Sequence, residues 1–176
     1  MTAEPAALAR FNELPADAAV EQLTAVCAAP SWAAAMASGR PYATVADAYA
    51  HSDTTVAALS VADLVTGLAG HPRIGERPAA GRPEQERSAG WSRQEQAGVH
   101  AADAATIGSL AEANAAYEQR FGHIYLVCAS GRTGAELLAL LQQRLGNNNE
   151  TEWHVVRTEL GKINRIRLGE LLGGPA

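Results

Sequence analysis

Apolar residues recur every three or four positions along most of this chain, which is the spacing of one face of an α-helix. Such faces follow Pro15, Ser31, Thr44 and Ser60. The last three of these residue types favour helix N-caps, because their side-chain oxygens accept hydrogen bonds from free N–H groups. We expect the helix after Ser60 to end at Gly70, since glycine commonly follows the last turn of a helix.

The same periodicity continues in the second half of the chain. Ser92 and Glu95 have the spacing of a capping box, which predicts that a helical stretch begins at Ser92 and runs towards Tyr117. Two further helices are expected, one that ends at Gly146 and one that ends at about Leu168.

Prolines, glycines and one strand-like run interrupt this helical pattern. The stretch 73–90 holds enough prolines and glycines to predict a loop without a long helix, and Gly98 and Gly108 are candidate breaks in the next helical stretch. The run from Ile124 to Cys128 favours extended structure, but it is too short and isolated to form a sheet. We therefore expect one short buried extended segment at about 124–129.

Composition supports a helical fold. Of the 176 residues, 38 are alanine, whereas only 15 are valine or isoleucine and 5% are aromatic. Alanine is the best helix former, and β-sandwiches and barrels need β-branched and aromatic residues. We expect an all-α fold, a single compact domain of about eight helices spanning residues 1–176.

Net charge and targeting signals limit the kinds of partner and the cellular location that we expect. The formal net charge of −5 argues against nucleic acid as the main partner. No apolar run approaches the length of a membrane span, so no membrane partner is expected. Two cysteines do not make a disulfide framework, and with no secretory signal at the N-terminus we expect a cytoplasmic location.

Four residues are candidates for carrying chemistry. His71 lies between Gly70 and Pro72, where a rigid turn can hold an imidazole as a general acid or base; a plain histidine at a helix end is the alternative. The pair Ser92 and Glu95 is either a structural capping box or a helix N-terminus that receives an anionic ligand. Arg167 is either a solvated side chain or a carboxylate clamp. No ligand spacing typical of a metal site is present, so no metal is expected.

Five motifs in a fixed order resemble a known family. They are His71-Pro-Arg-Ile-Gly, Ser92-Arg-Gln-Glu-Gln-Ala-Gly98, Asn114-Ala-Ala-Tyr-Glu-Gln-Arg-Phe-Gly122, Leu145-Gly-Asn-Asn, and the run from Glu159 to Leu168. In this order the sequence resembles the OHCU decarboxylases, where OHCU is 2-oxo-4-hydroxy-4-carboxy-5-ureidoimidazoline. The resemblance covers nearly the whole chain.

The resemblance implies an all-helical, cofactor-free carboxy-lyase that converts OHCU to (S)-allantoin and CO2 in urate degradation. It implies that His71 is the catalytic acid and that Glu95 acts with it. It also implies a substrate-binding set made of side chains and of the backbone of the extended run: Pro72, Ser92, Gln96, Tyr125, Leu126, Val127, Cys128, Ala129 and Arg167. The family further suggests a homodimer and a functional link to urate oxidase and to a transthyretin-like hydroxyisourate hydrolase.

Two departures from the family pattern leave alternatives open. The family commonly has Phe-Gly-Phe-Pro-Phe where this chain has Phe121-Gly-His-Ile-Tyr125, and the 75–90 loop is longer than expected. His123 therefore leaves open a related ureido or imidazoline acid as substrate. A non-catalytic helical binding module is a second alternative, and a metal-dependent hydrolase using His71, Glu95 and Glu76 is a third.

Overall fold

The computed structural model describes residues 5–75, 83–100 and 102–174, and these contain ten α-helices and no strand. The helices are α1 (Ala6–Glu13), α2 (Ala16–Val26), α3 (Pro30–Ser38), α4 (Val45–Ala58), α5 (Val61–Leu68), α6 (Pro83–Glu95), α7 (Ala97–His100), α8 (Ala104–Phe121), α9 (Gly134–Arg144) and α10 (Asn149–Leu172). The all-α prediction is confirmed, with ten helices in these residues rather than about eight.

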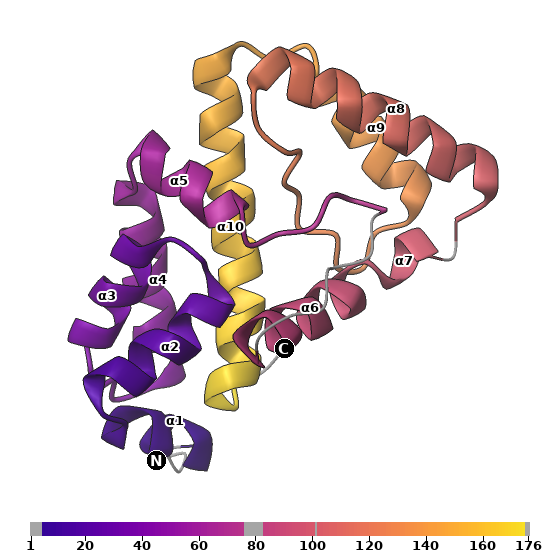
Figure 1. Cartoon of the computed structure of the whole chain (residues 1–176). Coiled ribbons are helices and arrows are strands. Elements are labelled where there is room, and N and C mark those ends of the chain that lie inside the picture. Colours follow the sequence, from indigo (N-terminus) through magenta and orange to yellow (C-terminus); the bar gives the residue numbers. More distant parts are fainter. Residues whose placement is uncertain (1–4, 76–82, 101, 175–176) are drawn as a thin grey trace.

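The longest helix, α10, is the axis of the fold. Its 24 residues extend for about 36 Å at 1.5 Å per residue. Figure 1 shows α1–α5 on one side of α10 and α6–α9 on the other, with the segment between α8 and α9 passing beside α10. No helix in the described part of the chain is long and apolar enough to cross a membrane.

The predicted extended segment is present, and it divides two hydrophobic cores. Leu126 and Cys128 pack in the core formed by α1–α5 and α10. Tyr125, Val127 and Ala129 pack in the second core, with residues of α8 and α9. Successive side chains of an extended chain point to opposite sides, so one short segment can seal both cores.

Side chains supply the hydrogen bonds that a neighbouring strand would otherwise give this segment. The C=O of Leu126 accepts a hydrogen bond from Nη1 of Arg144 at 2.7 Å. The N–H of Cys128 donates to Oε2 of Glu159 at 2.9 Å, and its C=O accepts from Nε of Arg132 at 3.2 Å. Buried backbone groups need such partners, which explains how an extended run persists without a sheet.

The predicted caps are confirmed at two helices and wrong at a third. Thr44 and Ser60 each form a complete capping box with the residue three positions later. Ser31 is not a cap, because α3 already begins at Pro30, a residue type suited to the first helical position. The hydroxyl of Ser31 instead donates to Asp63 of α5 at 2.7 Å.

The prediction of a loop without a long helix over 73–90 is wrong in its second half. Helix α6 begins at Pro83 and includes Gly90. A proline at the first position of a helix loses no hydrogen bond, so it begins α6 rather than preventing it. Ser92 and Glu95 consequently lie in the last turn of α6, and the predicted capping box at its start is wrong. The part of the loop at 76–82 lies outside the described residues.

The break in the next helical stretch falls at neither predicted glycine. Gly98 lies inside α7 and Gly108 inside α8, and α8 begins after Asp103, whose side chain accepts a hydrogen bond from Thr106 N–H at 2.7 Å. Gly98 has a different role: a Cβ there would meet the carbonyl oxygen of Arg132 at 2.0 Å. Glycine at this position lets α7 approach the turn that precedes α9.

Candidate active site

Arg167 on α10 is the centre of the site, with only 1% of its surface exposed. Its Nε and Nη2 donate to the two carboxylate oxygens of Glu95 at 2.8 and 3.0 Å. Nη2 also donates to the hydroxyl of Ser92 at 3.2 Å, and Nη1 donates to the C=O of Val26 at 3.2 Å. These four hydrogen bonds use four of the five N–H groups of the guanidinium.

The last turn of α6 supplies the partners of Arg167. Ser92 and Glu95 are three residues apart and therefore lie on one face of the helix. The preceding residue, Trp91, places its ring 5.8 Å from the Arg167 guanidinium carbon. A carboxylate is unfavourable at the negative end of a helix dipole, and the buried guanidinium offsets this. Both alternatives for Ser92, a structural capping box and an anion-binding helix start, placed it at a helix N-terminus; it lies instead at a helix end that contacts a cation.

His71 is held where the chain leaves α5. Its N–H donates to the C=O of Leu68 at 2.9 Å, and the residue is half-buried. Burial of the ring and the nearby positive charge of Arg167 both hold the pKa of His71 well below its usual value. The imidazole is therefore neutral near pH 7, and its surroundings link it electrostatically to Arg167.

Gln96 fastens the loop that follows His71 and Pro72. Its Oε1 accepts a hydrogen bond from Gly75 N–H at 2.9 Å, and its Nε2 donates to the C=O of Arg73 at 3.4 Å. Asn114 of α8 donates to the next carbonyl, that of Ile74, at 3.1 Å. Pro72 is half-buried. In this structure the side chain of Gln96 holds the histidine loop against α6.

The extended segment approaches the same site at Cys128. Burial raises the pKa of the Cys128 thiol, and the nearby negative charges of Glu159 and Glu95 raise it further. The ring of Tyr125, by contrast, faces the second core, where the guanidinium of Arg144 lies 4.7 Å from its centre. Only the backbone of Tyr125 therefore remains as a candidate for the pocket wall.

The structure brings together five of the eleven predicted site residues. His71, Glu95, Ser92, Arg167 and Cys128 are linked by the contacts and charges described above. Leu126 faces the same core as Cys128, whereas the side chains of Val127 and Ala129 face away from it.

Sequence reasoning missed three residues near Arg167 or the extended segment. Trp91 lies beside the guanidinium, Glu159 fixes the backbone at Cys128, and Asn164 is fully buried one turn before Arg167. Asn164 could have been found, because it falls on the helix face shared by Leu160 and Arg167, where an apolar residue is expected.

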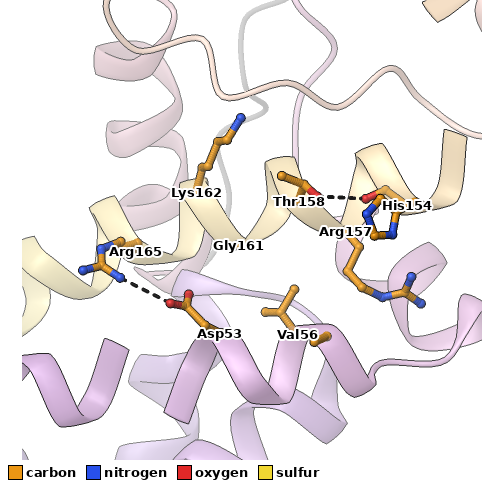
Figure 2. Close-up of a pocket in the computed structure, with 9 residues that line it drawn as sticks. Asp53, Val56, His154, Arg157, Thr158, Gly161, Lys162 and Arg165 are labelled. Carbon is orange, nitrogen blue, oxygen red and sulfur yellow. Dashed lines mark hydrogen bonds and ion pairs between the residues drawn. The ribbon is translucent and has the colours of Figure 1, made fainter. Parts of the chain in front are cut away.

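A separate groove lies between α4 and α10, with a volume of about 380 Å³ (Figure 2). Its wall includes an exposed ion pair in which Arg165 Nη1 and Asp53 Oδ2 are 3.3 Å apart, together with Lys162 and His154. None of the predicted site residues lines this groove. It is therefore distinct from the Arg167 site.

Metal-ligating side chains do not gather within the described ranges: no group of three or more His, Cys, Asp or Glu residues there is placed to hold a metal ion. Glu76, one member of the hydrolase alternative, lies outside the described residues. His71 and Glu95 lie near the buried guanidinium of Arg167, and a positive charge opposes cation binding.

A buried arginine paired with a carboxylate, beside a histidine loop, thus lies where α6, α10 and the end of α5 meet in an all-helical protein. The sequence model of the OHCU decarboxylases matches residues 12–169. The chain therefore belongs to the OHCU decarboxylase family.

Named relatives agree with this membership. The 2-oxo-4-hydroxy-4-carboxy-5-ureidoimidazoline decarboxylase of Amia calva is 33% identical over 147 residues, which cover 84% of this chain and 83% of that protein. The uric acid degradation bifunctional protein TTL of Arabidopsis thaliana is 29% identical over 157 residues, or 85% of this chain. The chain spans only 46% of that bifunctional relative.

Solved structures show the same fold. A crystal structure of OHCU decarboxylase in the presence of (S)-allantoin is 27% identical, with a TM-score of 0.73, and the match covers 87% of this chain and 98% of that one. A crystal structure of (S)-allantoin synthase matches with a TM-score of 0.66 at 16% identity, over 94% of this chain and 54% of that one. The second likeness extends to the fold alone.

Proposed function

We propose that this protein decarboxylates OHCU to (S)-allantoin without a cofactor, as a carboxy-lyase of urate degradation. The observation that carries the proposal is the buried pairing of Arg167 with Glu95 and Ser92, beside His71, in a chain that belongs to this family. These are residues to which the family resemblance assigns catalysis or substrate binding.

The reaction breaks one carbon–carbon bond and consumes one proton. The carboxylate leaves as CO2, and the electron pair of the broken bond is delocalised into the neighbouring C=N group of the ring. The nitrogen of that C=N group takes up one proton, and the adjacent ring carbon takes up a second, which sets the (S) centre. The hydroxyl group loses its proton and becomes a carbonyl, so one proton is consumed overall. A substrate with its own electron-accepting C=N needs no metal or pyridoxal for this step.

His71 is the proton carrier in this proposal. Its neutral imidazole accepts the proton of the substrate hydroxyl, or takes up the proton that the net reaction consumes, and delivers it to one face of the ring. A bound carboxylate raises the pKa of a neighbouring imidazole, so substrate binding itself prepares the ring for this transfer.

Glu95 and Arg167 orient the substrate. Glu95 accepts hydrogen bonds from ureido or ring N–H groups with the lone pairs that Arg167 leaves, and the fifth N–H of Arg167 donates to a substrate oxygen. Gln96, Pro72 and the backbone of 125–129 complete the pocket wall in this proposal. The support for Gln96 is indirect, since its side chain already holds the histidine loop.

The test is the optical activity of the product. OHCU generated freshly from urate decays spontaneously to racemic allantoin, so circular dichroism of the product separates catalysis from decay. We expect the wild type to give an excess of (S)-allantoin and His71→Ala and His71→Gln to give none. A wild-type rate and the same enantiomeric excess in either variant would contradict the role of His71.

The remaining family-based expectations are also proposals. We propose a single domain that acts as a homodimer in the cytoplasm, in sequence with urate oxidase and a transthyretin-like hydroxyisourate hydrolase. Relatives named as uric acid degradation bifunctional proteins support the pathway link, and the two unpaired cysteines fit a reducing compartment. Light scattering tests the dimer.

The alternative of a different ureido acid as substrate rested on His123. The ring of His123 lies 4.2 Å from that of Trp153 and 5.5 Å from that of Tyr117. These contacts place it in an aromatic cluster between α8 and α10. OHCU is therefore the substrate we propose.

A further inference from the structure

Asn164 is a fully buried polar residue whose side-chain amide forms no hydrogen bond with the described residues. It lies on α10 three residues before Arg167, so the two side chains project from the same face of the helix. None of its surface is exposed. Neither its Oδ1 nor its Nδ2 has a hydrogen-bond partner in the structure.

A neighbour of Asn164 is the thiol of Cys27, at the end of α2. Burial raises the pKa of this thiol, while the amide of Asn164 and the charge of Arg167 act in the opposite direction. The carbonyl of the preceding residue, Val26, accepts a hydrogen bond from Arg167. Asn164 therefore lies among the groups that surround the Arg167 guanidinium.

A thiol is a weak partner for an amide, and its geometry here does not reach a hydrogen bond. A primary amide buried without partners destabilises a folded protein, and an apolar side chain of the same size would be more stable at this position. Asn164 lies on the same face of α10 as Arg167. A polar residue is explained at this position if a bound ligand supplies the hydrogen-bond partners that its amide lacks.

We infer that Asn164 is a specificity-determining residue, which pairs its amide with a cyclic urea or ureido group of the substrate; this rests on the proposed function. Such a group presents an N–H beside a C=O. Oδ1 of Asn164 can accept from that N–H while Nδ2 donates to that C=O, so two parallel hydrogen bonds form. The side chain of Arg167 has no hydrogen-bond acceptor, so Oδ1 of Asn164 adds an acceptor beside it that can bind a substrate N–H group.

The test compares Asn164→Leu with the wild type in OHCU kinetics, in calorimetric binding of (S)-allantoin, and in thermal unfolding. Leucine keeps the volume and removes both hydrogen-bonding groups. We expect KM and the allantoin Kd to rise at least about tenfold, as for the loss of two hydrogen bonds in a buried site. We expect Tm to stay the same or to rise, because the variant no longer buries an unpaired amide.

Cys27→Ala is the matched control, since it removes the thiol neighbour and leaves Asn164 intact; we expect its KM to be unchanged. An unchanged KM in Asn164→Leu, or a raised KM with a lowered Tm, would overturn the inference, as would the same rise of KM in Cys27→Ala. Asn164→Ala carries the same KM prediction if the leucine variant does not fold. Racemic product from the wild type would contradict the proposed function instead.

Discussion

Arg167 and Glu95 meet with two parallel hydrogen bonds inside the protein, Nε to Oε1 at 2.8 Å and Nη2 to Oε2 at 3.0 Å. The two residues come from α10 and from the last turn of α6, so their pairing holds α6 against the central helix. The exposed fractions of their side chains are 1% and 11%. A buried pair of this kind is costly to break from one side only.

Replacing Glu95 with Gln tests this pairing. The variant leaves the guanidinium of Arg167 buried without a counter-charge, and we expect the free energy of unfolding to fall by about 3 kcal/mol. Urea denaturation measures it. The double variant Glu95→Gln/Arg167→Met removes both charges, so it should lose less than the sum of the two single losses. Additive losses would show that the two side chains are not coupled.

His71 gives the protein a pH-dependent stability. Burial and the charge of Arg167 hold its pKa well below the usual value of about 6.5. Below about pH 6.5 the unfolded chain therefore binds a proton at this residue that the folded protein does not bind, so stability falls as the pH falls. Above that pH the contribution is fully present.

The measurement is Tm between about pH 7.5 and 5 for the wild type and for His71→Gln. We expect a steeper acid loss of Tm in the wild type, since the variant lacks this group. The other histidines are common to both proteins, so their contributions cancel in the comparison. Parallel curves would mean that His71 titrates normally in the folded protein.

The extended segment depends on Arg144. This arginine donates to the C=O of Leu126 and to Glu152, which is itself fully buried and also bonded to Tyr117. We expect Arg144→Met to lower the free energy of unfolding by about 3 kcal/mol or more, because it leaves a buried carboxylate without its counter-charge and a buried carbonyl without its hydrogen bond. Chemical denaturation monitored by far-ultraviolet circular dichroism measures the loss.

Arg165→Met is the matched control for Arg144→Met. Arg165 is also on a helix and also in an ion pair, with Asp53 at 3.3 Å, but both side chains are about half exposed, at 55% and 51%. Exposed pairs contribute little, so we expect a loss below about 1 kcal/mol. If both variants lost the same free energy of unfolding, burial of the ion pair would not explain the loss in Arg144→Met.

The periodicity of apolar residues predicted most helices, because helix formation on an amphipathic face is local information. Thr44 and Ser60 were predicted correctly as caps for the same reason: each bonds to a residue three positions away. Pro83 misled the prediction, since a proline that ends one helix and one that begins another look alike in a single sequence. Ser92 and Glu95 were consequently assigned to the wrong end of their helix.

The site was harder to predict from local rules, because its partners come from distant positions. Arg167 bonds to Glu95 and to the carbonyl of Val26, which lie 72 and 141 positions away. No spacing rule connects such residues. Local patterns singled out Glu95 and Arg167 and the family resemblance gave them roles, but neither indicated their direct pairing or the burial of Asn164.

Two glycines in neighbouring helices, Gly98 of α7 and Gly108 of α8, differ in the atoms that surround them. Gly98→Ala places a Cβ against the carbonyl oxygen of Arg132, only 2.0 Å away, whereas a Cβ at Gly108 of α8 meets nothing within 4 Å. We expect Gly98→Ala to lower the free energy of unfolding by about 2 kcal/mol, because backbone must move. Gly108→Ala should instead raise it by about 0.5 to 1 kcal/mol through helix propensity. Thermal and urea unfolding of both variants measure the difference, and changes of the same sign would contradict the close packing of α7 against the turn before α9.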